Sequence, residues 1–135
     1  MEAPFPPHPE PSWIIAVRAA EAKQASDIIV LDLRDVSSFA DYFVICTGSN
    51  PRQNQAICDE AGLQLGKLGE LPECVEGYQN AEWILADYGY FLLHVFLEKT
   101  REYYDLERLW KHARKVRIPE SEPAAHSAKY ALGSA

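Results

Sequence analysis

The sequence has no long hydrophobic run, so no transmembrane helix is expected. No stretch reaches the roughly 18 consecutive apolar residues of a membrane-spanning helix. The first residues, MEAPFPPHPEPSW, carry proline and glutamate where a signal peptide needs a basic start and an apolar stretch. They also lack the arginines that are typical of a transit peptide. We therefore expect a cytoplasmic protein without membrane contact.

Cysteines are few, and their spacing argues against a fold held by disulfide bonds or by a metal ion. Cys46, Cys58 and Cys74 are odd in number and far apart, without a C-x-x-C pair. A disulfide framework or a zinc site is therefore not expected. Reduced thiols that act as small, partly buried hydrophobic side chains are the simpler interpretation.

Basic residues are outnumbered by acidic ones. The chain has 20 Asp and Glu against 13 Lys and Arg, which gives a formal net charge of -7. A phosphate backbone repels a negative surface, so broad contact with DNA or RNA is disfavoured and a basic partner is favoured. The one basic stretch, 111–117 (KHARKVR), could touch RNA. Basic residues beside the negative end of a helix dipole explain it more simply.

Proline and small polar residues separate the two ends of the chain from a single domain. Residues 1–11 hold five prolines and predict a mobile arm, while residues 119–135 (PESEPAAHSAKYALGSA) predict a flexible tail. The 47% hydrophobic and 24% charged residues are an ordinary globular balance. We expect one domain between residues 12 and 118.

Hydrophobic periodicity predicts helices and strands in mixed order. Short β-branched or apolar runs predict strands over 27–33, 41–48, 74–78, 82–88 and 90–98. Helical spacing predicts helices over 12–21, 51–69 and 102–113. Ser12 is the expected N-cap of the first helix, and Asn50, Pro51 and Gln53 form a capping-box start for the second. The order predicts an α/β fold with a mixed β-sheet of about five strands flanked by helices.

The loop Thr47–Arg52 is the one place that could support catalysis. Its Gly-Ser pair leads from a predicted strand into a helix N-terminus, where free N–H groups can bind an anion. Nucleotidyltransferases use such a loop together with carboxylates that hold magnesium. Asp59 and Glu60 are adjacent on a predicted helix and point about 100° apart, so they cannot form that clamp. A nucleotide-binding or nucleotidyltransferase-type enzyme therefore stays the alternative to a plain strand-to-helix turn.

Other catalytic patterns are missing. The sequence has no Walker A loop, no G-x-G-x-x-G and no H-E-x-x-H. His94, the only histidine in a predicted core strand, fits a hydrogen-bonded structural residue better than a general base. We expect no enzyme, no cofactor and no metal site.

Aromatic and acidic residues gather within fifteen positions, at Glu76, Tyr78, Glu82, Trp83, Asp87, Tyr88 and Tyr90. Alternation along the strand 82–88 puts Trp83, Leu85 and Asp87 on one face. It puts Glu82 and Tyr88 on the other. Large aromatic side chains rimmed by carboxylates are typical of a hot spot for a basic partner. A core Trp83 on an ordinary amphipathic strand is the alternative, and both stay open.

The run Asp32–Ser49 (DLRDVSSFADYFVICTGS), followed by Arg52-Gln53, resembles the signature of the Iojap or ribosomal silencing factor (RsfS) family. Further matches follow in order at Glu76-Gly77, Trp83-Ile84-Leu85, Asp87, Gly89, His94, Arg101, Tyr104–Glu107 and Leu109-Trp110. The resemblance covers about residues 12–112. One departure is Tyr90, where the family usually has Asp directly after the glycine of the turn.

The resemblance implies a nucleotidyltransferase-like fold without the catalytic carboxylates. Members of the family bind the large ribosomal subunit through ribosomal protein uL-fourteen, block its association with the small subunit and repress translation in bacteria. Organellar relatives act in large-subunit biogenesis, and members are often homodimers. The sequence does not separate silencing from assembly, since both use the same docking surface. Together with the aromatic-acidic cluster, the resemblance predicts partner-binding residues Glu76, Glu82, Trp83, Asp87, Tyr88, Arg101 and Tyr104, with little direct contact to nucleic acid.

Overall fold

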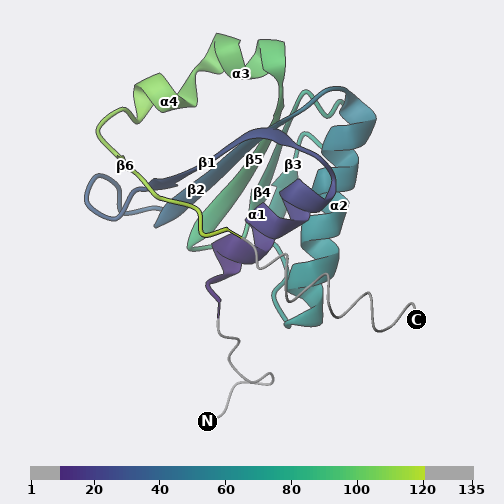
Figure 1. Cartoon of the computed structure of the whole chain (residues 1–135), viewed down its shortest axis with the longest axis horizontal. Helices are drawn as coiled ribbons and strands as arrows, with labels where there is room; N and C mark the ends of the chain where they lie inside the picture. Colours follow the sequence, from purple (N-terminus) through teal and green to yellow (C-terminus); the bar gives the residue numbers. More distant parts are fainter. Residues whose placement is uncertain (1–9, 121–135) are drawn as a thin grey trace.

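A single mixed sheet forms the centre of the protein in the computed structural model, which describes residues 10–120 (Figure 1). The strands are β1 (Ser26–Asp32), β2 (Tyr42–Gly48), β3 (Cys74–Glu76), β4 (Trp83–Asp87), β5 (Phe91–Leu97) and β6 (Arg114–Lys115). The helices are α1 (Ser12–Ala22), α2 (Pro51–Lys67), α3 (Glu98–Tyr104) and α4 (Leu106–Leu109). Among these residues no helix has the length and apolar character needed to span a membrane.

The sheet has the strand order β3-β4-β5-β2-β1-β6. β2 and β5 are parallel, and the other neighbouring strands are antiparallel. The predicted mixed α/β sheet is confirmed, with one strand more than the five expected. Because β2 and β5 run in the same direction, both finish at the end of the sheet that α3 crosses (Figure 1).

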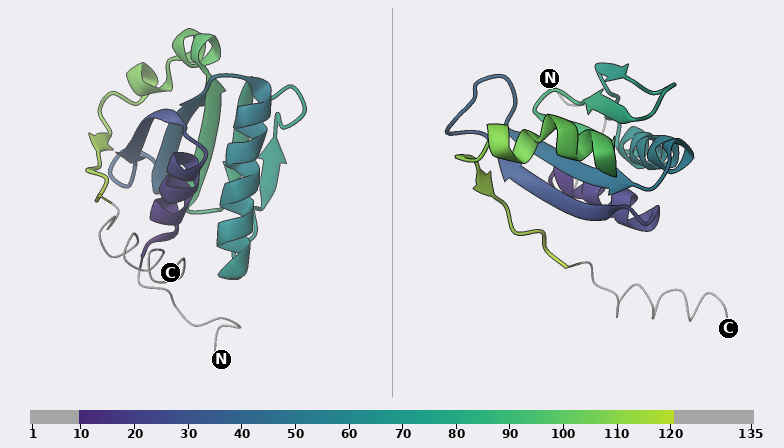
Figure 2. Two further views of the ribbon diagram at one scale, coloured as in Figure 1. Left: turned by 45° about the vertical axis from the view of Figure 1, so that its right-hand side comes forward. Right: turned by 90° about the horizontal axis from the view of Figure 1, so that it is seen from above.

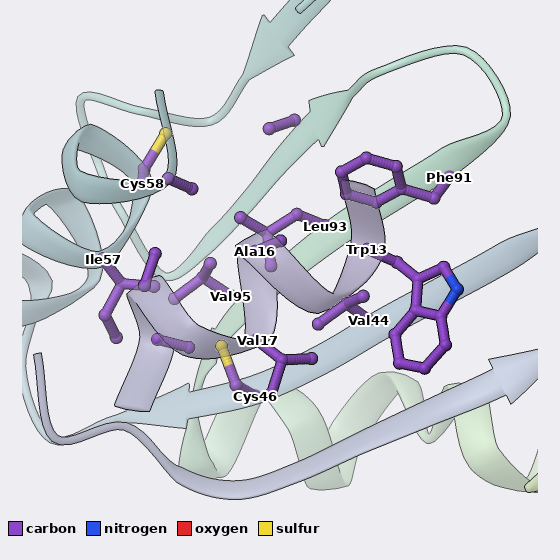
Figure 3. Packing of buried hydrophobic residues seen from close by; sticks show 14 of the residues in the cluster. Trp13, Ala16, Val17, Val44, Cys46, Ile57, Cys58, Phe91, Leu93 and Val95 are labelled. Atoms are coloured by element: carbon purple, nitrogen blue, oxygen red, sulfur yellow. The ribbon is translucent and has the colours of Figure 1, made fainter. Parts of the chain in front are cut away.

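Two hydrophobic clusters fill the two faces of the sheet. α1 and α2 cover one face (Figure 2). Figure 3 shows Ala16 and Val17 of α1 beside Val44 and Cys46 of β2, and all four side chains are fully buried. On the opposite face, strand residues such as Phe43 pack with residues of α4 and its C-terminal neighbours.

The start of α1 differs from the prediction. Pro11 occupies the N-cap position without a side-chain hydrogen bond, and Ser12 is the first helical residue. The Ser12 hydroxyl instead donates to the carboxylate of Glu70 at 2.6 Å. The Ser12 N–H donates to the hydroxyl of Tyr90 at 2.9 Å. The predicted N-cap role of Ser12 is therefore wrong. Tyr90, the departure from the family pattern, accepts a hydrogen bond from an N–H at the start of the helix.

The predicted start of α2 is confirmed at Asn50. Its side-chain oxygen accepts from the N–H of Gln53 at 2.8 Å, and Pro51 is the first helical residue. The Gln53 side chain does not complete the reciprocal bond of a capping box to Asn50. It accepts from the N–H of Ser49, one residue earlier, at 2.6 Å.

The predicted helix 102–113 is wrong in extent. α3 begins directly after β5 and ends at Tyr104, and the following Asp105 adopts a left-handed conformation with φ 49° and ψ 57°. A short α4 follows, and the basic stretch 111–117 then enters β6 instead of ending a helix. β6 pairs with β1, and its Arg114 binds the buried carboxylate of Asp32 at 3.0 Å. Arg34 binds the same carboxylate at 2.7 Å, so two cations fix this edge of the sheet.

The last described residues pack on the α1 side of the sheet. Val116 and Ile118 pack against the cluster that α1 buries, and Arg18 of α1 donates to the carbonyl of Pro119. Most of the predicted arm and tail, residues 1–9 and 121–135, lie outside the described residues.

Candidate partner-binding site

A continuous set of rings lies on the sheet face opposite α1 and α2. Each ring contacts another through centroids no more than 6.1 Å apart. We call this set the aromatic face: Phe39, Phe43, Trp83, His94, Phe96, Tyr103, Tyr104 and Trp110. The loop between β1 and β2, the strands β2, β4 and β5, and the C-terminal helical region all contribute to it.

Trp83 occupies the middle of the aromatic face and is half-buried. Its ring stacks on Phe96 of β5 at 4.9 Å and meets the ring of Tyr104 at 4.7 Å. Its indole N–H donates to Nδ1 of His94 at 3.1 Å. The predicted alternation is confirmed, because Trp83 and Leu85 pack with the cluster on this face, while Ile84 and Ala86 are buried on the other. Trp83 is thus neither a fully buried core residue nor a free surface one.

His94 lies beneath Trp83 with a side chain that is neutral at ordinary pH. The residue is 3% exposed, and its burial lowers the pKa of the imidazole to about 3. Because Nδ1 accepts the indole N–H, the single proton of the neutral ring sits on Nε2. Nε2 is buried without a hydrogen-bond partner among the described residues. His94 therefore holds Trp83 in place and has the structural role that its position in β5 predicts.

The outer part of the aromatic face is open to solvent. Tyr103 is 80% exposed, Phe39 59% and Tyr104 50%. Exposed aromatic side chains that continue into a packed cluster mark surfaces at which proteins bind one another.

Carboxylates lie beside the aromatic face at the β3 edge of the sheet. Glu76 of β3 is exposed and pairs in register with Leu85, so both side chains project from the same face. Asp87 shares this face with Trp83 but lies four residues along the strand, roughly 13 Å away. The Asp87 carboxylate accepts the N–H of Gly89 at 2.8 Å and stabilises the turn into β5. Glu76 is therefore the acidic residue best placed for a partner on this side.

Arg101, a predicted partner-binding residue, is 9% exposed and engaged within the protein. Its guanidinium donates to the carbonyl of Asp27 at 2.6 Å and to the hydroxyl of Thr47 at 2.8 Å. It also forms an ion pair with Glu107 at 3.0 Å. These contacts tie α3 to the ends of β1 and β2, so Arg101 positions the helix that carries Tyr104.

Two more of the predicted residues are not brought into the aromatic face. Tyr88 packs on the α2 side of the sheet, where its ring stacks on Phe91 at 5.0 Å. Glu82 is exposed, precedes β4, and bonds through its carbonyl to the N–H of Leu97. The aromatic-acidic cluster of the sequence is therefore divided between the two faces of the sheet.

Sequence reasoning did not assign Phe39, Phe43, His94, Phe96, Tyr103 and Trp110 to the site. These residues lie up to 71 positions apart in the printed sequence, and only the sheet order brings them together. Phe39, Phe43, His94 and Trp110 do belong to the matches that carry the family resemblance. That resemblance was the one signal that could have pointed to them.

Two N–H groups at the Thr47–Arg52 loop and the start of α2 are occupied by side chains. Gln53 accepts from the N–H and the hydroxyl of Ser49, and Asn50 accepts from the N–H of Gln53. Downstream, the Asp59 carboxylate accepts from the hydroxyl of Tyr78 at 2.9 Å. The loop as it stands does not offer these N–H groups to a phosphate.

The other reactive groups are also held in unreactive states. Burial raises the pKa of the Cys46 thiol to about 12 and that of Cys58 to about 11. Both thiols therefore remain protonated at neutral pH and are poor nucleophiles. In residues 10–120, no group of three or more His, Cys, Asp or Glu side chains is arranged to hold a metal ion.

Similarity to known proteins is extensive. The family model described as "Ribosomal silencing factor during starvation" matches residues 6–133. A Bacillus subtilis protein named ribosomal silencing factor RsfS is 42% identical over 99 residues, which cover 73% of this chain and 84% of the relative. A mouse protein named mitochondrial assembly of ribosomal large subunit protein 1 is 32% identical over 95 residues, 65% of this chain and 40% of the relative. A crystal structure of a Chromobacterium violaceum protein superposes with a TM-score of 0.73 at 31% identity, covering 82% of this chain and 91% of that one.

Proposed function

We propose, because this chain belongs to the ribosomal silencing factor (RsfS) family, that it binds the large ribosomal subunit through ribosomal protein uL-fourteen and prevents association with the small subunit. The observation that carries the proposal is the aromatic face, with the half-buried Trp83 at its centre and Glu76 at its side. The protein acts by binding and not by catalysis.

The physical properties of the aromatic face support a protein partner. Trp83 and Tyr104 provide large, partly exposed apolar surface whose burial contributes most of the affinity in typical interfaces. The net charge of -7 opposes contact with ribosomal RNA and favours a basic ribosomal protein. Trp83, Tyr104 and Glu76 are the proposed direct contacts. Arg101 contributes by fixing α3.

Inhibition by such binding needs no chemical step. A rigid body of 15.2 kDa that occupies part of the intersubunit surface prevents two large particles from meeting there. Repression of translation then depends on the fraction of large subunits that carry the protein, and so on the affinity of the aromatic face.

The test is to measure binding to isolated large subunits, subunit joining and thermal unfolding on the same Trp83→Ala variant. We expect the wild-type chain to co-sediment with large but not small subunits and to reduce joining. Loss of a central aromatic residue should cost about 2 kcal/mol or more of binding free energy. A variant that is folded at the assay temperature and still blocks joining would overturn the assignment of Trp83.

A role in large-subunit assembly is the second candidate, favoured by the name of the mouse relative. The same surface would serve it, since both roles require the large subunit. Deletion of the protein separates the two roles. Accumulation of immature large subunits would indicate assembly, while mature subunits with increased joining in starved cells would indicate silencing.

A further inference from the structure

A groove of about 570 Å³ lies between α2 and β3, on the side of the sheet away from the aromatic face. Val75 of β3 pairs in register with the buried Ala86, so its side chain projects toward α2. Leu63 of α2, Pro72 and Tyr78 complete the apolar walls. Leu63 is 54% exposed and Val75 39%, so the groove holds large apolar side chains open to solvent. α2 and β3 run beside one another in both views of Figure 2.

The floor of the groove is formed where α2 has no side chain. A Cβ added to Gly62 would find only the hydroxyl of Tyr88 nearby, at 4.0 Å. That hydroxyl makes no hydrogen bond with another residue in the part of the chain that the structure describes. The groove thus combines apolar walls with one polar group at its floor.

β3 is an edge strand. Within the described residues it pairs with β4 alone, so one side of its backbone is open to another strand. An unpaired edge beside an apolar groove fits an extended peptide, which adds to the sheet and places alternate side chains in the groove.

The charge around the groove identifies the kind of peptide. Residues 59–76, which span the second half of α2 through β3, contain Asp59, Glu60, Glu70, Glu73 and Glu76 against the single basic residue Lys67. The segment therefore has a net charge of -4, five acidic residues less one basic residue. A second copy of a chain with charge -7 is repelled from such a surface. A segment that carries lysine or arginine is attracted to it.

We propose that the groove between α2 and β3 is a second docking site, which binds an extended segment of a protein partner with alternating apolar and basic side chains. The segment pairs with the free edge of β3, and its apolar side chains enter the groove beside Val75 and Leu63. Its basic side chains project from the other face of the sheet, where Glu76 of β3 also projects. The groove itself lies on the opposite side of the sheet from Trp83.

The test is a titration of the isotope-labelled full chain with a synthetic peptide of alternating valine and lysine, followed by amide chemical shifts. We expect shifts along β3 and the second half of α2. Gly62→Leu, which fills the groove without a backbone clash, should weaken binding about tenfold or more. Gly66→Leu is the matched control, because a Cβ there meets nothing within 4 Å and the residue does not line the groove. It should bind like the wild type.

Three results would each overturn the proposal: no shifts at β3, equal binding by Gly62→Leu, or equal binding of a peptide of alternating valine and glutamate. A fourth such result would come from sedimentation of the chain alone. If the wild-type chain self-associates and Gly62→Leu does not, the groove binds a second copy of the chain. Binding to large subunits is measured in parallel. Gly62→Leu should keep it, so the failure of this proposal is distinct from a failure of the aromatic face.

Discussion

Trp83 and His94 act as one unit across the β4–β5 pair, because the indole N–H of Trp83 donates to Nδ1 of His94 at 3.1 Å. The bond uses the one polar group of the indole inside the protein. The ring therefore presents an apolar surface to a partner and needs no polar atom opposite its N–H.

The first prediction concerns this hydrogen bond. His94→Leu removes the acceptor and leaves a partly buried N–H unpaired, which should lower the free energy of unfolding by about 1–3 kcal/mol. His94→Gln retains a side-chain carbonyl that can accept, and it should recover part of the loss. Urea unfolding followed by circular dichroism measures both variants. A His94→Leu protein as stable as the wild type would show that the bond does not hold the indole.

The second prediction is a pH dependence caused by His94. Burial lowers its pKa from 6.5 to about 3 in the folded protein, so between these values the unfolded chain binds more protons than the folded one. Stability is therefore complete above pH 6.5 and falls as the pH decreases toward 3. Between pH 7 and pH 5 the loss should be about 2 kcal/mol in the free energy of unfolding. His94→Gln should flatten the curve in this range, and an unchanged slope would contradict the assignment.

Sequence patterns predicted the parts of the fold that depend on local chemistry. Asn50, Pro51 and Gln53 mark the start of α2, because a cap needs residues only three positions apart. Alternation around Trp83 predicted its face correctly, because side chains in a strand alternate wherever the strand lies.

The parts that were missed depend on tertiary contacts. β6 has two residues and no periodicity, and it is stabilised by Asp32, 82 positions before Arg114. Ser12 precedes a helical pattern and was therefore predicted to be its N-cap. The sequence does not reveal that the Glu70 carboxylate lies beside its hydroxyl in the fold and accepts its hydrogen bond. Tyr88 is close to Trp83 in the chain and lies on the other face, while Phe39 is remote in the chain and joins the aromatic face through Phe43 and Trp110.

The third prediction separates binding from stability on the aromatic face. Tyr104 is 50% exposed and contacts the Trp83 ring, so Tyr104→Ala should change the free energy of unfolding little. It should weaken binding to the large subunit by about 1–2 kcal/mol, as a truncated aromatic contact does. Leu71→Ala is the control, because Leu71 is 75% exposed and lies next to Pro72 of the α2–β3 groove. Equal binding losses in both variants would mean that the effect is not specific to the aromatic face.

The fourth prediction uses salt to test the acidic edge. Glu76 is exposed and projects from the same face as Leu85, so Glu76→Lys replaces an attraction to a basic partner by a repulsion. The association rate with large subunits should fall by about tenfold at low ionic strength. The loss should be much smaller at about 0.5 M salt, because the Debye length there is below about 5 Å. Glu10→Lys makes the same charge change at an exposed residue before α1 and should have little effect at either salt concentration. Thermal unfolding should be alike in the two variants, since neither carboxylate is buried. If Glu76→Lys associates as fast as Glu10→Lys at low salt, the partner does not approach over the β3 edge, and the contact surface lies instead toward Tyr103 and Phe39.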